Sequence, residues 1–239
     1  MTVGLDDIDL VIFDKDGTLI DFGAMWRGWA TEVAAALRAS TGRPIEGPLF
    51  TMFGYDPAAG RILPGGGLAA TPMARLRDRT RDILVAAGLT TSDAERALQM
   101  AWHAPDPVAL ARPLTDLEAL FSGLRRSGKR IAIATSDDRE PTERTLAALD
   151  LTGSVDATIC ADDGIVVKPA PDMVLHLCAT FGIAPDRTAV VGDTREDLWM
   201  ARAAGAGLTI GVLTGVDDRE DLAPFADLVL DSVGGFLPE

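Results

Sequence analysis

The sequence is poor in several features, and each scarcity excludes a class of protein. It has two cysteines in 239 residues, Cys160 and Cys178. Two are too few for a disulfide framework in a chain of this size, and no C-x-x-C pair or Cys/His cluster indicates zinc. No apolar run approaches the ~20 residues that span a bilayer, and the polar, acidic N-terminus does not resemble a signal peptide. We therefore expect a cytoplasmic protein.

Basic residues are scarce as well. There are 22 Lys and Arg against 36 Asp and Glu, which gives a net charge of −14. This balance argues against nucleic acid and anionic membrane as partners, because both attract basic surfaces. An anionic substrate would be repelled at long range, so any anion site must supply its own local positive charge.

What the chain does have is an alternation of helices and apolar strands from Thr115 onward. Helices are predicted at 116–127, about 141–150, 172–181 and 195–204, and strands at 131–134, 157–160, 189–191, 208–212 and 228–230, the last as an edge strand. Together with a buried strand at 10–13, this pattern indicates right-handed βαβ units and a parallel sheet that is covered on both faces. The predicted fold class is α/β.

The segment after the first strand has the pattern of a helical insert. Apolar side chains at helical spacing predict a helix over 25–40. The Thr71-Pro72 pair predicts a second helix ending at Gly88, and a capping box at Ser92–Glu95 predicts a third. Residues 41–71 are rich in Gly and Pro and are predicted as loop with short helical pieces.

These patterns predict two domains. With 47% apolar residues, the chain is able to bury a sizeable core, which excludes a disordered protein. We expect an α/β domain made of residues 1–20 and 112–239. A helical domain, residues 21–111, interrupts it after its first strand.

Charged and hydroxyl side chains follow the predicted strands. In chain order they are Asp14 and Asp16, Thr135 and Ser136, Lys168, Asp193 and, four residues further on, Asp197. In an open parallel α/β sheet, ligands bind outside the carboxyl ends of the strands. The sequence therefore brings acids, hydroxyls and one lysine to one edge of the sheet from four separate segments.

The acids in this group suit a hard divalent cation. Side chains two residues apart on an extended chain point the same way, so Asp14 and Asp16 can face one cleft. Two carboxylates so close repel each other unless a cation lies between them or one takes a proton. Asp193 adds further oxygen, and Asp197 lies one helical turn on, where it could support the metal from behind. Mg2+ prefers such oxygen ligands, and it is the predicted cofactor.

Other residues suit an anion. Thr135 and Ser136 can hold phosphoryl oxygens together with free amides at helix N-termini, although Ser136 is equally suited to cap the next helix. Lys168 supplies a compact cation. Three further candidates for substrate binding are Gly17, Thr18 and Arg61. Gly17 permits a tight turn beside the acids. Arg61 is either an anchor for a second anionic group or a solvated loop arginine.

Four motifs in this order resemble those of the haloacid dehalogenase (HAD) superfamily, in which most members are Mg2+-dependent phosphatases. They are Asp14-Lys15-Asp16-Gly17-Thr18, Ile131–Ser136, Lys168–Asp172 and Gly192–Asp197. They cover the α/β part from end to end, and the insert looks like a C1-type cap, as in phosphoglycolate-phosphatase-like members. The resemblance implies a HAD-like Rossmannoid sheet with an inserted helical cap.

The resemblance also implies a role for each core residue. Asp14 would be the nucleophile that forms an aspartyl-phosphate. Asp16 would protonate the leaving oxygen and then activate water, while its backbone carbonyl binds Mg2+ with Asp14 and Asp193. Thr135 would hydrogen-bond the phosphoryl group, and Lys168 would neutralise charge on it and on Asp14. The implied partner is a small phosphorylated metabolite.

Two positions depart from the family pattern. Lys15 occupies a slot that is often apolar, and the alternation of side chains predicts that it faces away from Asp14 and Asp16. Gly192 stands where some relatives carry an extra acid, which leaves three protein ligands plus water.

Alternative functions share the same core residues. A phosphomutase of the beta-phosphoglucomutase type differs only in whether water or a sugar hydroxyl attacks the phospho-enzyme. The presence of Asp16 argues against a dehalogenase, and the insert has no lysine for Schiff-base chemistry. A non-enzymatic phospho-acceptor module is disfavoured by the large insert. The sequence identifies neither the phosphomonoester nor the oligomeric state, monomer or homodimer.

Overall fold

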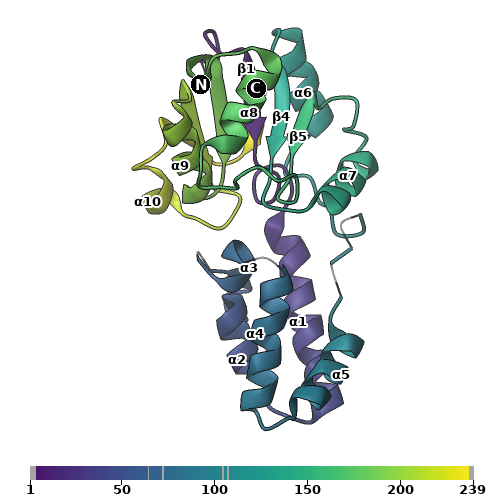
Figure 1. Ribbon diagram of the computed structural model, residues 1–239. Helices are drawn as coiled ribbons and strands as arrows, with labels where there is room; N and C mark the ends of the chain where they lie inside the picture. The colour runs from purple at the N-terminus through teal and green to yellow at the C-terminus, as the bar shows by residue number, and fades with distance from the viewer. Residues whose placement is uncertain (1–3, 64, 72, 104, 107, 237–239) are drawn as a thin grey trace. The chain divides into compact units, whose positions relative to one another are not determined.

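In the computed structural model, which describes residues 4–63, 65–71, 73–103, 105–106 and 108–236, the chain divides into two units (Figure 1). One comprises Met1–Phe22 and Pro107–Glu239, and the other comprises Gly23–Asp106. The sequence prediction divided the chain after residues 20 and 111. The larger unit is α/β and the inserted unit is mainly helical.

A six-stranded parallel sheet forms the centre of the α/β unit. Its strands are β1 (Leu10–Phe13), β4 (Arg130–Ala134), β5 (Ala157–Ile159), β6 (Thr188–Gly192), β7 (Leu208–Val212) and β8 (Leu228–Leu230). They lie in the order β5-β4-β1-β6-β7-β8, and every neighbouring pair is parallel. The predicted α/β class is confirmed, with residues 228–230 at one edge of the sheet.

Helices cover both faces of this sheet. They are α6 (Leu117–Arg126), α7 (Arg139–Ala148), α8 (Asp172–Phe181), α9 (Arg195–Ala204) and the short α10 (Arg219–Leu222), with 3-10 turns at Pro185–Arg187 and Val233–Phe236. Val11 and Phe13 of β1 belong to one core cluster with α6. Leu10 and Ile12 belong to the other, with α8 and α9. Burial on both faces explains why the strands are continuous apolar runs.

The order of the strands reverses at β1. From β1 the chain enters β4 and then β5 on one side, and it returns through α8 to β6 on the other side. The carboxyl ends of β1, β4 and β6 therefore lie side by side at a topological switch point, which is where open α/β sheets bind ligands.

The inserted unit contains α1 (Phe22–Thr41, which begins one residue before the boundary), α2 (Glu46–Phe53), the short α3 (Gly67–Ala70), α4 (Met73–Ala86) and α5 (Thr91–Ala101). Strands β2 (Tyr55–Asp56) and β3 (Arg61–Ile62) form a small antiparallel hairpin. Trp29 anchors the packing: its ring meets that of Trp102 edge-on at 5.0 Å, and its indole N–H donates to the His103 carbonyl at 2.6 Å.

The start of α5 differs from its prediction. The N-cap of α5 is Thr90, whose side chain accepts the amide of Asp93. The predicted cap was Ser92, but Thr90 has the same spacing to an acid three residues on, so the helix begins earlier. Pro72, which was predicted to open the second helix of the insert together with Thr71, lies outside the described residues.

The loop between α2 and α3 depends on a close contact between glycines. Gly54 ends α2 at φ 71°, and a Cβ at that position would lie 2.4 Å from the Cα of Gly66. Gly60 has a similar φ of 63°, but open space surrounds it. We expect Gly60→Ala to cost about 1 kcal/mol of unfolding free energy, from backbone strain alone. Gly54→Ala should cost about 3 kcal/mol, because overpacking adds to the strain.

Urea unfolding of the two variants measures this difference directly. Equal losses would show that the contact between Gly54 and Gly66 does not stabilise the inserted unit.

Candidate active site

The structure brings the predicted core residues together at the carboxyl edge of the sheet. Asp14 follows β1, and its amide donates to the Val191 carbonyl of β6 at 2.9 Å. Thr135 follows β4 and is buried. Asp193 follows β6, and Lys168 reaches Asp14 from the loop before α8. Four segments that are distant in sequence thus meet at the switch point.

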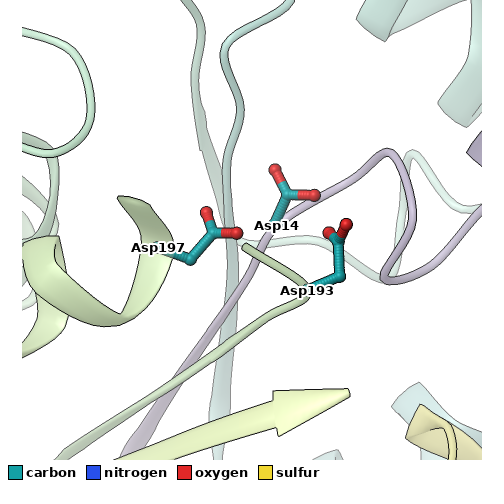
Figure 2. A group of neighbouring side chains, drawn as sticks. All are labelled: Asp14, Asp193 and Asp197. Carbon is teal, nitrogen blue, oxygen red and sulfur yellow. The ribbon is translucent and has the colours of Figure 1, made fainter. Parts of the chain in front are cut away.

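Three buried carboxylates form a cluster there. Asp14, Asp193 and Asp197 each offer one oxygen, and these oxygens lie within 4.8 Å of one another. Figure 2 shows Asp197 at the start of α9 with its carboxylate beside that of Asp14, and Asp193 on the other side. The carboxylate of Asp16 is not part of this group.

Lys168 is the cation of this cluster. Its Nζ lies 2.5 Å from Oδ1 of Asp14 and 2.5 Å from Oδ1 of Asp197. Burial alone would lower the pKa of Lys168, but these two carboxylates raise it above its ordinary value. Lys168 is therefore a permanent cation that joins the nucleophile candidate to α9.

One lysine does not balance three buried acids. Burial raises the pKa of Asp14 to about 6, with Asp197 and Asp16 adding to the effect and Lys168 opposing it. Burial and the charge of Asp14 raise the pKa of Asp193 well above its usual range. A further cation would relieve this repulsion, and donors that are all oxygen suit a hard ion such as Mg2+. The residues present fit the predicted cofactor.

Asp193 is held on several sides. Thr18 Oγ1 donates to its Oδ1 at 3.0 Å, and the Val216 amide donates to its Oδ2 at 3.1 Å. A Cβ on Gly17 would lie 2.4 Å from that Oδ2, and a Cβ on Gly215 would lie 1.7 Å from it. The two glycines leave the space that the carboxylate fills. Thr18 thus supports Asp193, and its predicted contact with substrate remains a prediction.

Asp197 contacts both Thr194 and Lys168, one through each carboxylate oxygen. It forms a capping box with Thr194 at the start of α9, where its Oδ2 accepts the Thr194 hydroxyl at 2.6 Å. Its Oδ1 meets Lys168. A Cβ on Gly192 would lie 2.2 Å from the Cβ of Asp197. The side chain of Asp197 therefore leaves no room for a side chain at position 192.

Asp16 pairs with a different group of charges. Nζ of Lys15 lies 2.6 Å from Oδ2 of Asp16 and 3.1 Å from Oδ2 of Asp137. The prediction that Lys15 faces away from Asp16 is wrong. The alternation on which it rested holds only for extended chain, and β1 ends at Phe13, after which the chain turns through Gly17 at φ 93°.

Two predicted substrate residues take no part in the contacts described above. Ser136 is exposed, and the N-cap of α7 is Asp138 rather than Ser136. Arg61 lies on β3 of the inserted unit with an exposed side chain. Substrate binding by Ser136 and by Arg61 remains a prediction.

Sequence reasoning missed Asp137 and the loop after β7. Thr214 Oγ1 in that loop donates to the Gly17 carbonyl at 2.6 Å. The same loop contains Gly215, which leaves space for the carboxylate of Asp193, and Val216, whose amide donates to it. Both segments directly follow strands, β4 and β7. Inspecting the residues after every strand of the sheet, including β7, would have found them.

Comparisons with known proteins agree with this geometry. A model of the haloacid dehalogenase-like hydrolase family matches residues 8–205. A phosphoglycolate phosphatase of Shigella sonnei is 29% identical, over 98% of this chain and 92% of the relative, and one of Aquifex aeolicus is 25% identical, over 82% and 81%. The chain therefore belongs to the haloacid dehalogenase-like hydrolase family and is an enzyme of the hydrolase class.

Solved structures share the fold. A HAD hydrolase of Entamoeba histolytica superposes with a TM-score of 0.68 at 21% identity, over 95% of this chain and 94% of that one. A candidate beta-phosphoglucomutase of Thermotoga maritima gives 0.67 at 18% identity, over 96% and 97%. At identities this low, the likeness shows the fold alone.

The helices were also compared with the length and apolar character of a membrane span, and none in the described part of the chain has both.

Proposed function

We propose that the protein is a Mg2+-dependent phosphatase that hydrolyses a small phosphomonoester through an aspartyl-phosphate at Asp14. The observation that carries the proposal is the buried acid cluster at the switch point, with Asp14 paired to Lys168. The relatives named phosphoglycolate phosphatase support a substrate of the phosphoglycolate or sugar-phosphate type.

The proposed reaction has two steps. A carboxylate oxygen of Asp14 attacks phosphorus, and the bond from phosphorus to the leaving oxygen breaks while Asp16 donates a proton to that oxygen. Water then attacks phosphorus and gives its proton to Asp16. The bond to Asp14 breaks, and inorganic phosphate leaves. Thr135, which directly follows β4, would donate a hydrogen bond to the phosphoryl group.

Two cations would balance the charge of the phosphoryl group. Asp14, Asp193 and the backbone carbonyl of Asp16 would hold Mg2+, which would supply positive charge for the phosphoryl oxygens. Lys168 supplies the other charge and stays fixed through Asp197. Because the catalytic groups are positioned before the substrate arrives, the protein acts mainly by positioning and charge stabilisation.

Hydrolysis of 4-nitrophenyl phosphate tests the proposal. We expect phosphate release with Mg2+, none with EDTA, and none from Asp14→Asn under either condition. Equal activity of wild type and variant would refute the mechanism. A screen of phosphoglycolate, sugar phosphates and nucleotides then identifies the substrate, and an isomerised sugar phosphate without phosphate release would favour a phosphomutase.

The contact between Thr18 and Asp193 gives a further prediction. Thr18→Val removes the hydroxyl that holds Oδ1 of Asp193, and losing such a supporting contact weakens metal binding by about 10- to 100-fold. We expect the Mg2+ concentration for half-maximal activity to rise by about 10-fold or more. Thr18→Ser retains the hydroxyl and should stay close to wild type. A Mg2+ titration that does not separate Val from Ser would contradict this role.

A further inference from the structure

Lys15 is a buried charge that the proposed reaction does not use. Its side chain is 1% exposed, which is unusual for lysine. Two carboxylates face its Nζ, those of Asp16 and Asp137. Burial alone would lower the pKa of Lys15, but these carboxylates raise it to about 12, so it is a cation.

Filling space does not require this cation. An apolar side chain of similar length would occupy the same volume without the cost of removing a charge from water. Buried ion pairs are therefore weak evidence of a role in stability alone. Lys15 stands between two catalytic candidates in the chain, Asp14 and Asp16, and its Nζ contacts the carboxylate of Asp16.

The two oxygens of Asp16 are not equivalent. Oδ2 lies 2.6 Å from Nζ of Lys15. Oδ1 is buried and has no hydrogen-bond partner among the described residues. One oxygen is thus held in an ion pair with Lys15, and the other is left for a ligand.

The second carboxylate ties Lys15 to the loop after β4. Oδ1 of Asp137 accepts the Asp138 amide at 2.9 Å, and the Asp137 amide donates to Oγ1 of Thr135 at 3.1 Å. The carboxylate of Asp137 is thereby fixed relative to Thr135, the proposed phosphoryl contact. Lys15 connects that fixed group to Asp16.

We propose that Lys15 is a positioning residue that, braced by Asp137, anchors Oδ2 of Asp16 and presents Oδ1 to the leaving oxygen of the ester. This inference rests on the proposed function, in which Asp16 is the general acid and base. In the first step the proton passes from Oδ1 of Asp16 to the leaving oxygen as the bond from phosphorus to that oxygen breaks.

Two aryl phosphates of nearly equal shape test the role. Phenolate is more basic than 4-nitrophenolate, so phenyl phosphate depends more on proton donation than 4-nitrophenyl phosphate. The quantity to measure is kcat/KM, which reports the steps up to the breaking of the ester bond. For Lys15→Met we expect a loss of about 10- to 100-fold with phenyl phosphate and of about 3-fold or less with 4-nitrophenyl phosphate.

Asp137→Asn removes the brace and should shift the ratio of the two substrates in the same direction by a smaller factor. This variant also decides the matter if Lys15→Met does not fold. A loss that is equal for both substrates in the folded variants, or no loss at all, would overturn the positioning role.

Asp16→Asn separates this inference from the function on which it rests. We expect it to lose about 100-fold or more with phenyl phosphate. If Asp16→Asn retains full activity, the proposed function of Asp16 fails, whatever Lys15→Met does. If Asp16→Asn is inactive while Lys15→Met keeps the wild-type ratio, only the inference on Lys15 fails.

Discussion

Asp14→Asn should abolish hydrolysis and at the same time stabilise the metal-free protein. The amide is not a nucleophile, so we expect kcat to fall by about 10⁴-fold or more. The charge of Asp14 is costly in the fold, because burial raises its pKa from 3.8 to about 6. Removing that charge should add about 2–3 kcal/mol to the unfolding free energy at about pH 8.

The pH dependence has a definite sign. A carboxyl whose pKa is higher in the folded state binds its proton more tightly there, so its contribution to stability is complete below pH 3.8 and is lost as pH rises through about 6. The advantage of Asp14→Asn in EDTA should therefore be small near pH 4 and reach its full size above about pH 6.

Thermal unfolding in EDTA measures this, with Asp82→Asn as the control. Asp82 is an acid of α4 with a side chain that is 74% exposed, and its replacement should leave the melting temperature nearly unchanged. A melting temperature of Asp14→Asn below that of wild type at about pH 8 would contradict the conclusion that the buried acids carry more negative charge than Lys168 balances.

Lys168→Met should lower both the stability and the activity of the protein. It leaves Asp14 and Asp197 buried without their shared cation. Removing one partner of a buried ion pair costs about 3–5 kcal/mol, and the loss of the positive charge at the phosphoryl position should lower kcat by about 10²- to 10³-fold. Lys129→Met is the matched control, because Lys129 donates to the backbone carbonyls of Leu5 and Ile8 and meets no acid of the cluster.

The double variant Lys168→Met/Asp14→Asn sharpens this prediction. With one of the two uncompensated carboxylates gone, it should unfold at a higher urea concentration than Lys168→Met alone. Strictly additive changes in free energy would show that Lys168 and Asp14 are not energetically coupled.

The bounds of helices and strands could be predicted in the α/β unit, where burial on both faces of the sheet makes each strand a continuous apolar run. Strands 208–212 and 228–230 and the helix 195–204 were predicted with the bounds that the structure has. Residues 41–71 were harder, because α2 and the β2–β3 hairpin depend on the contact between Gly54 and Gly66, twelve positions apart in the chain.

The same distinction holds for the site. Residues placed by the end of a strand, such as Asp14 and Asp193, could be predicted because parallel strands end at a common edge. Lys15 and Thr18 could not, since their contacts depend on the path of the chain after β1. That path brings Thr18 to Asp193, 175 residues away, and turns Lys15 back onto Asp16.

Mass spectrometry of the acid-quenched enzyme tests the central claim most directly. Wild-type protein mixed with Mg2+ and 4-nitrophenyl phosphate should carry one phosphoryl group on the peptide that contains Asp14, and a second mixing with buffer should remove it at the rate of turnover. Asp14→Asn should carry none. Turnover without a phosphoryl group on Asp14, or with one on another residue, would contradict the proposed chemistry of this site.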